Sequence, residues 1–171
     1  MRRALASLAL LAVVAVLVVG RGDDGGEGGS ARGGAARDGR VVRVVDGDTI
    51  HVRVDGRDER VRYIGIDTPE DVKPGTPVQC FARAAAAANA RLVAGREVRL
   101  VADAEARDRF GRMLAYVFRA DDGRFVNAEL VHDGFARTLT IAPNVRYARR
   151  FAGLAAEARR AGRGLWAACS S

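Results

Sequence analysis

The strongest constraint on the fold is a strand–turn–strand pattern that begins at Arg40. Residues 50–54 alternate apolar and polar side chains, which is the period of a half-buried strand. Asp55-Gly56 follows as a turn signal, and a second, less regular alternating run extends over residues 59–66. Together with the valine-rich run at residues 41–45, this pattern predicts a three-stranded meander.

Helical and strand patterns share the remainder of the chain. Phe81, Ala85, Ala88 and Leu92 recur at helical spacing, and Gly95 follows as a stop signal. Further elements are expected as two strands, a short helix and a longer helix at residues 97–101, 113–118, 127–133 and from Tyr147 onward. Five short strands with inserted helices predict an α+β fold with a mainly β core, a five-stranded OB-type barrel with three helices.

The first 20 residues have the pattern of a targeting segment. Arg2 and Arg3 precede an apolar run at residues 4–19, which is typical of a signal peptide or an N-terminal membrane anchor. Residues 21–39 are rich in glycine and are expected to form a flexible linker. We therefore expect a secreted or extracellular domain at residues 40–169, tethered to the membrane only if the leader is not cleaved.

Charge and cysteine content limit the partners and the compartment. The chain carries 28 basic and 21 acidic residues, a net charge of +7, which favours polyanionic partners. A general arginine bias is the alternative, because Lys73 is the only lysine. Cys80 and Cys169 are an even pair in an exported chain, which favours a disulfide over a metal site. Two unpaired thiols are the alternative.

Candidate chemistry is concentrated in three short stretches, residues 46–49, 62–70 and 108–112. Their carboxylates suit Ca²⁺ or Mg²⁺, and their arginines suit phosphate oxygens. Each stretch taken singly has a structural explanation. Asp-Gly-Asp-Thr is often a turn, and Asp-Thr-Pro-Glu can start a helix.

In combination, these stretches resemble the signature blocks of the thermonuclease (staphylococcal nuclease-like) family. The shared blocks read VDGDTI, RYIGIDTPE, DRFGR with LAY, VNAELV and GLW, and the resemblance covers residues 41–166. It implies the same OB barrel with three helices. It also implies a hydrolase, a Ca²⁺-dependent endonuclease that cleaves DNA and RNA at the bond to the 5′-oxygen and leaves 3′-phosphates.

The resemblance also implies roles for six residues. Calcium ligands are expected from the side chains of Asp48 and Asp67 and the backbone carbonyl of Thr68. Glu70 is expected to hold the attacking water as general base. Arg62 and Arg112 are expected to bind the scissile phosphate.

Partners and alternatives follow from the same comparison. The substrate is expected to be DNA or RNA, preferably single-stranded, with no protein partner and a monomeric enzyme. One alternative is a catalytically inactive OB-type nucleic-acid-binding module. Another is a tethered envelope protein whose basic surface holds anionic polymers.

Several nearby residues are expected to lie outside the chemistry. Asp46 and Asp108 are assigned to local structure, and His51 and His132 are expected to be non-catalytic because no suitable partner lies at a useful spacing. Family members often present tyrosines before a proline as a wall for the nucleotide base. Here the segment at residues 139–143 has Leu139 and Ile141 instead, so base affinity or preference is expected to differ.

Overall fold

The computed structural model describes residues 35–70, 75 and 77–169, all within the second of the two units into which the chain divides, residues 31–171. The leader and residues 21–34 of the expected linker lie outside the described residues. Among the described residues, no helix is both long enough and apolar enough to cross a membrane.

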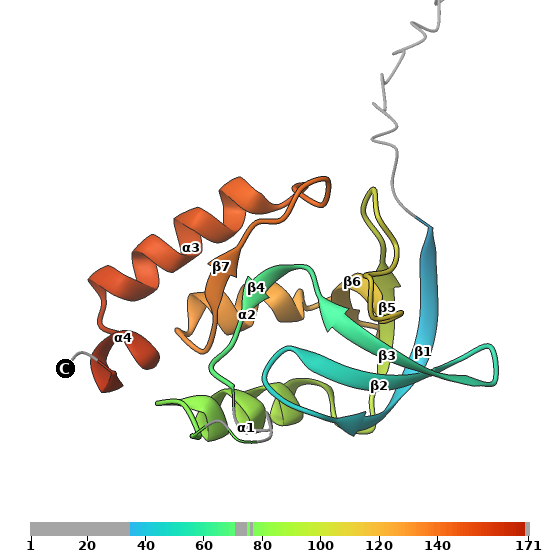
Figure 1. Ribbon diagram of the computed structural model, residues 1–171, viewed down its shortest axis with the longest axis horizontal. Helices are drawn as coiled ribbons and strands as arrows, with labels where there is room; N and C mark the ends of the chain where they lie inside the picture. The colour runs from blue at the N-terminus through green and yellow to red at the C-terminus, as the bar shows by residue number, and fades with distance from the viewer. Residues whose placement is uncertain (1–34, 71–74, 76, 170–171) are drawn as a thin grey trace, which may run out of the picture. The chain divides into compact units, whose positions relative to one another are not determined.

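Five strands close into a barrel in the order β1-β2-β3-β6-β5 (Figure 1). Neighbouring strands are antiparallel except β3 and β6, which are parallel. The expected five-stranded barrel is confirmed. Its strands are β1 (Ala36–Val44), β2 (Thr49–Val54), β3 (Arg57–Tyr63), β5 (Glu97–Val101) and β6 (Met113–Arg119).

The first strand begins four residues before the expected domain boundary at residue 40. Ala36–Arg40 pair in antiparallel register with Val101–Glu97 of β5. Residues 36–39 therefore belong to the barrel and not to the linker. Sequence periodicity missed them because this part of β1 has few apolar side chains, and its partner strand lies about 60 residues further along the chain.

The third predicted strand divides into two. β3 ends at Tyr63, and Gly65 then adopts a φ of 81°, a conformation that favours glycine. A Cβ atom at Gly65 would also collide with the ring of Phe151. The chain continues as β4 (Gly65–Asp67), which pairs with β7 (Arg137–Leu139) in a separate two-stranded sheet that was not expected.

The helices are α1 (Ala82–Val93), α2 (Val126–His132), α3 (Ala148–Arg160) and α4 (Leu165–Ala168), so the described region adds one short helix to the three expected. α2 packs against α1, α3 and β6, and α3 also contacts the β4–β7 pair (Figure 1). Between α3 and the barrel, Tyr147 packs edge-on against Tyr116 with ring centroids 4.6 Å apart. Tyr147 is therefore a packing residue.

Candidate active site

The turn between β1 and β2 holds the first pair of carboxylates. The Asp48 amide donates to Oδ1 of Asp46 at 2.9 Å, which closes the turn on itself. From α1, Nδ2 of Asn89 donates to the Asp46 carbonyl at 2.9 Å and fixes the turn against the helix. Gly47 lacks a Cβ for a steric reason, because a Cβ there would lie 2.7 Å from the Thr68 side chain. The close approach brings the turn to the end of β4.

Asp48 is the centre of the site and is only 4% exposed. Its Oδ2 accepts hydrogen bonds from the Thr68 amide at 2.8 Å and the Thr68 hydroxyl at 3.0 Å. Its Oδ1 accepts from the Thr49 hydroxyl and lies 3.1 Å from Nε of Arg62. These four contacts fix the Asp48 carboxylate in position.

Arg62, near the end of β3, links Asp48 to the second carboxylate. Its Nη2 atom donates to Oδ1 of Asp67 at 2.8 Å. Its Nη1 atom donates to the carbonyls of Tyr63 and Ile66 at 3.0 and 2.9 Å. The carbonyls are available because the chain bends after Tyr63, and they hold the guanidinium plane in one orientation.

Arg112 is oriented by Asp108, which caps the turn before β6. Asp108 Oδ2 accepts from Nε of Arg112 at 2.7 Å, and Oδ1 accepts the Phe110 and Arg112 amides. Burial acts to raise the pKa of Asp108, but the hydrogen bonds from Arg112 outweigh it, so that pKa lies below its usual range. Asp108 thus has the supporting role expected for it.

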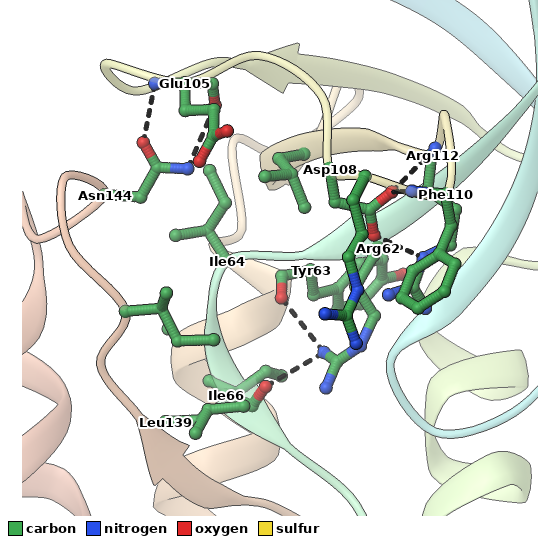
Figure 2. A pocket seen from close by; sticks show the side chains of 14 residues that line it. Arg62, Tyr63, Ile64, Ile66, Glu105, Asp108, Phe110, Arg112, Leu139 and Asn144 are labelled. Carbon is green, nitrogen blue, oxygen red and sulfur yellow. Dashed lines mark hydrogen bonds and ion pairs between the residues drawn. The ribbon is translucent and has the colours of Figure 1, made fainter.

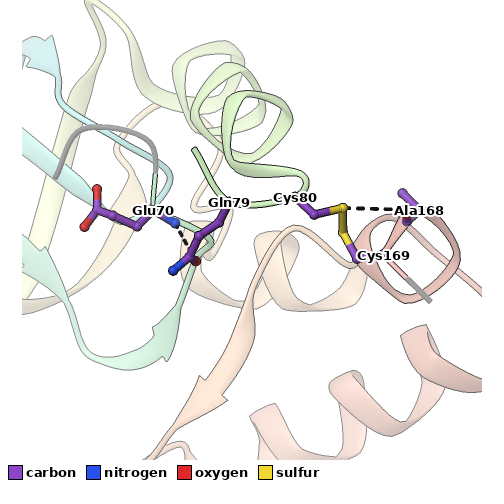
Figure 3. The surroundings of a disulfide bond; sticks show 5 residues. All are labelled: Glu70, Gln79, Cys80, Ala168 and Cys169. Atoms are coloured by element: carbon purple, nitrogen blue, oxygen red, sulfur yellow. Dashed lines mark hydrogen bonds between the residues drawn. A yellow bond between two sulfur atoms is a disulfide. The ribbon is translucent and has the colours of Figure 1, made fainter. Parts of the chain in front are cut away.

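Glu70 is fixed through its backbone. Its amide donates to Oε1 of Gln79 at 2.9 Å, and its carbonyl accepts from the Gln79 amide at 3.0 Å. Cys80, which follows Gln79 in the chain, forms a disulfide with Cys169 (Figure 3). The predicted disulfide is confirmed, and it joins the C-terminal end of the chain to the segment that carries Gln79.

The six predicted site residues line one cavity of about 270 Å³. It is bounded by Asp46, Asp48, Thr49, Arg60, Arg62, Asp67, Thr68, Pro69, Glu70 and Arg112. Four carboxylates thus face three arginines, and the structure brings residues from the three sequence stretches together. Arg60 also lines the cavity, although it lies outside the three stretches that the sequence indicated.

Burial shifts the titration of one of these groups. Burial of Asp46, together with the charge of Asp48, raises the pKa of Asp46 to about 6. The negative charges of the two neighbouring carboxylates, Asp46 and Asp48, repel each other. A cation beside them would relieve that repulsion.

The donor set fits a hard divalent cation. Asp48 and Asp67 both contact the Arg62 guanidinium. Their carboxylates therefore already attract a positively charged group. The side chain of Asp67 is 55% exposed and can reach a ligand. Within the described region, no three His, Cys, Asp or Glu side chains gather as a metal cluster. Hard divalent cations accept backbone carbonyl oxygens and water beside carboxylates.

A second cavity, of about 440 Å³, adjoins the first and shares Arg62 and Arg112 with it (Figure 2). Leu139 and Ile141 line this cavity. They stand at the positions where tyrosines were expected from the family resemblance. Phe110 also lines it and is 69% exposed, and the guanidinium carbon of Arg109 lies 4.8 Å from its ring centroid. An aromatic ring is therefore present in the second cavity, supplied by the loop before β6.

Two buried amide side chains, to which the sequence assigned no role, hold backbone groups near the site. Asn89 accepts from the Tyr63 hydroxyl at 2.9 Å while it holds the acidic turn. Asn127 accepts from the Val117 amide and donates to the Ile64 carbonyl, both at 2.9 Å. The only signal for Asn127 was its place in the VNAELV block, which does not show what its side chain contacts.

Neither histidine lines either cavity. Nδ1 of His51 contacts Asp58 at 2.7 Å on the outer side of β2. His132 contacts Asp133 at the end of α2. Both placements agree with a non-catalytic interpretation.

Comparison with known proteins identifies the family. The family model described as staphylococcal nuclease homologue matches residues 60–168. The chain is 48% identical over 107 residues to a thermonuclease of Staphylococcus intermedius, covering 63% of this chain and 62% of that protein. It is 39% identical over 127 residues to a thermonuclease of Staphylococcus hyicus, covering 74% of each. It is 40% identical over 111 residues to endonuclease YncB of Bacillus subtilis, covering 64% of this chain and 52% of that protein. The chain belongs to the staphylococcal nuclease homologue family.

Proposed function

We propose that this protein is a secreted, Ca²⁺-dependent endonuclease that hydrolyses phosphodiester bonds of DNA and RNA and prefers single strands. One observation carries the proposal, namely the single cavity that holds the expected carboxylates together with Arg62 and Arg112. Relatives named as thermonucleases and an endonuclease support the reaction class.

Calcium would be held by the side chains of Asp48 and Asp67 and the carbonyl of Thr68. When bound, it supplies positive charge that neutralises phosphate oxygens. The cavity needs that charge, because its carboxylates outnumber its arginines by one. An extracellular setting suits such a site, since weak calcium sites with Kd of about 10⁻⁴–10⁻³ M are filled there.

Arg62 and Arg112 would bind the phosphate from two sides. Asp108 contacts the Arg112 side chain at Nε, which leaves the terminal nitrogens of Arg112 to face the cavity. Because the guanidinium groups are oriented before substrate arrives, they need little rearrangement as charge builds on the phosphate oxygens.

Glu70 would accept a proton from the attacking water. The water oxygen bonds to phosphorus while the bond from phosphorus to the 5′-oxygen breaks. The products are a 3′-phosphate and a 5′-hydroxyl, whose oxygen takes up a proton as it leaves. Pairing of the Glu70 backbone with Gln79 keeps the carboxylate at the cavity during this step.

Export is proposed from the leader pattern and from the disulfide, a bond that persists in oxidising compartments. N-terminal sequencing of protein recovered from culture medium tests this directly. A mature terminus close to residue 20 is expected. Protein retained in the cytoplasm with its full leader would contradict export.

The reaction is tested with purified protein on single-stranded DNA, single-stranded RNA and duplex DNA. The expected result is cleavage that requires Ca²⁺, stops with excess chelator, is fastest on single strands and leaves 3′-phosphate ends. Products with 5′-phosphates would contradict the proposed bond. A protein that binds these strands in calcium but never cuts them would instead be an inactive binding module.

A further inference from the structure

The outward side of the β1–β2–β3 sheet carries arginines that extend from the catalytic cavity. Arg60 and Arg62 lie two residues apart on β3, so they share one side of the sheet, and both line the cavity. The register places His51 opposite Arg60 and Arg43 opposite His51. Arg53 follows His51 on the same side of β2. We call Arg43, Arg53 and Arg60 the arginine strip.

The arginine strip has few ion-pair partners among the described residues. Within the described part of the chain, neither Arg53 nor Arg60 forms an ion pair. Nη2 of Arg43 donates to Nε2 of His51 at 2.9 Å and not to a carboxylate. Asp58, the acidic residue beside the strip, contacts the other ring nitrogen of His51 at 2.7 Å. Arg43 and Arg53 therefore lie outside the cavity with one carboxylate beside them, that of Asp58, which is opposite Arg53 in the register. Arg60 shares the cavity with its four carboxylates.

The neighbouring part of the barrel is arranged differently. Across β1 and β5, Arg40 pairs with Glu97 and Arg99 pairs with Asp38. At the boundary, Arg40 lies directly opposite Arg53 in the β1–β2 register, and like charges in that position repel each other. A bound polyanion would relieve this repulsion. The arginines that already pair with carboxylates across β1 and β5 would attract a polyanion only weakly.

We propose that the arginine strip binds phosphates of the substrate strand beyond the scissile bond, so that a long single strand is held more tightly than a short one. The inference rests on the proposed nuclease function and assigns its substrate path. Arg60 begins that path, because it faces the cavity beside Arg62. Arg53 lies diagonally across the strand pair from Arg60, about 7–8 Å away between Cα atoms, and Arg43 lies one strand further.

Continuity with the cavity favours nucleic acid over an anionic membrane. A polynucleotide places one phosphate in the cavity and others at regular intervals outside it, so a single ligand can contact Arg62 and the strip together. A membrane surface would contact the outer arginines without engaging the cavity. The test therefore includes both ligands.

The experiment compares Arg43→Gln/Arg53→Gln with Arg149→Gln/Arg160→Gln, which removes the same charge from exposed positions on α3. Two readouts are used. The first is KM and kcat on an oligothymidylate of roughly 20 nucleotides, longer than the site of an OB fold, and on a dinucleotide with a single phosphodiester bond. The second is fluorescence anisotropy of the labelled oligonucleotide in excess chelator, over a range of salt, together with binding to phosphatidylglycerol vesicles.

For the strip variant, we expect KM on the long strand to rise roughly tenfold, as for two exposed charge contacts, with kcat unchanged. KM on the dinucleotide should stay within twofold of wild type. The slope of log K against log salt should become shallower by about 1.4, the value for two phosphate contacts on a single strand. The α3 variant should match wild type in each measurement.

The proposal is overturned if the two double variants behave alike, or if the strip variant loses vesicle binding and keeps oligonucleotide binding. An equal loss on both substrates would also overturn it, because the strip would then act on the cavity and not on flanking phosphates. If the wild-type protein cleaves neither substrate, the nuclease function fails. The anisotropy and salt data still decide whether the strip binds a single strand.

Discussion

Removal of the Cys80–Cys169 disulfide should lower stability far more than it alters the site. The two cysteines are 89 residues apart, so the bridge closes a loop that spans most of the domain. Chain entropy for a loop of that size corresponds to about 4.6 kcal/mol of stabilisation at 25 °C, near the upper end of the usual range. In a domain of this size, that loss should lower Tm by roughly 10–20 °C.

The assay is thermal unfolding of Cys80→Ser/Cys169→Ser followed by circular dichroism, with urea unfolding as a second measurement. Wild-type protein treated with a reducing agent should unfold like the double variant. The double variant itself should not respond to the reductant. This comparison separates loss of the bridge from the effect of the serine side chains.

The loop-closure argument would be refuted by a Tm that falls by less than about 3 °C, a change worth only about 1 kcal/mol. Such a result would mean that packing of α4 holds the C-terminal segment in place without the bridge. A single Cys169→Ser variant should unfold like the double variant, because either substitution opens the same loop.

Three other changes test the groups that support the site. Gln79→Met keeps the side-chain length but removes the acceptor for the Glu70 amide, so kcat should fall about tenfold or more. Gln79→Glu retains an acceptor oxygen and should recover most of the rate. Equal rates in the two variants would show that the hydrogen bond does not position Glu70. Asn127→Leu should lower the free energy of unfolding by about 2–5 kcal/mol, because two buried backbone groups lose their partner; urea unfolding measures this, and a loss below 1 kcal/mol would contradict the assignment. Asp108→Asn weakens the hold on Arg112 and should raise KM several-fold on every substrate, whereas an unchanged KM would mean that the turn alone orients the guanidinium.

The barrel could be predicted because its signals are local. Alternation in β2 and the Asp55-Gly56 turn fix a hairpin from adjacent residues, and both turn residues adopt the positive φ that such a turn requires. The start of β1 could not be predicted, because its pairing with β5 depends on residues far along the chain. The division of β3 from β4 depends on the bulk of Phe151, which is also distant in sequence.

The residues of the candidate site could be predicted from the sequence, but the residues that hold them in position could not. Asp48, Glu70 and the arginines stand in short motifs whose combination is specific, and the cavity brings them together. Asn89 gave no comparable signal, since its partner at the Asp46 carbonyl is 43 residues away. Phe110 was quoted in a motif, yet only the folded loop shows that its ring lines the second cavity.

In the proposed mechanism, Glu70 activates water in a cavity that binds phosphate independently of Glu70. Single-turnover cleavage of single-stranded DNA by Glu70→Gln, with the Kd of the same strand measured alongside, tests this most directly. We expect a rate lower by roughly 10²–10⁴, the usual contribution of a general base, and a Kd within a few-fold of wild type. A variant that binds equally well and cleaves within tenfold of the wild-type rate would contradict it.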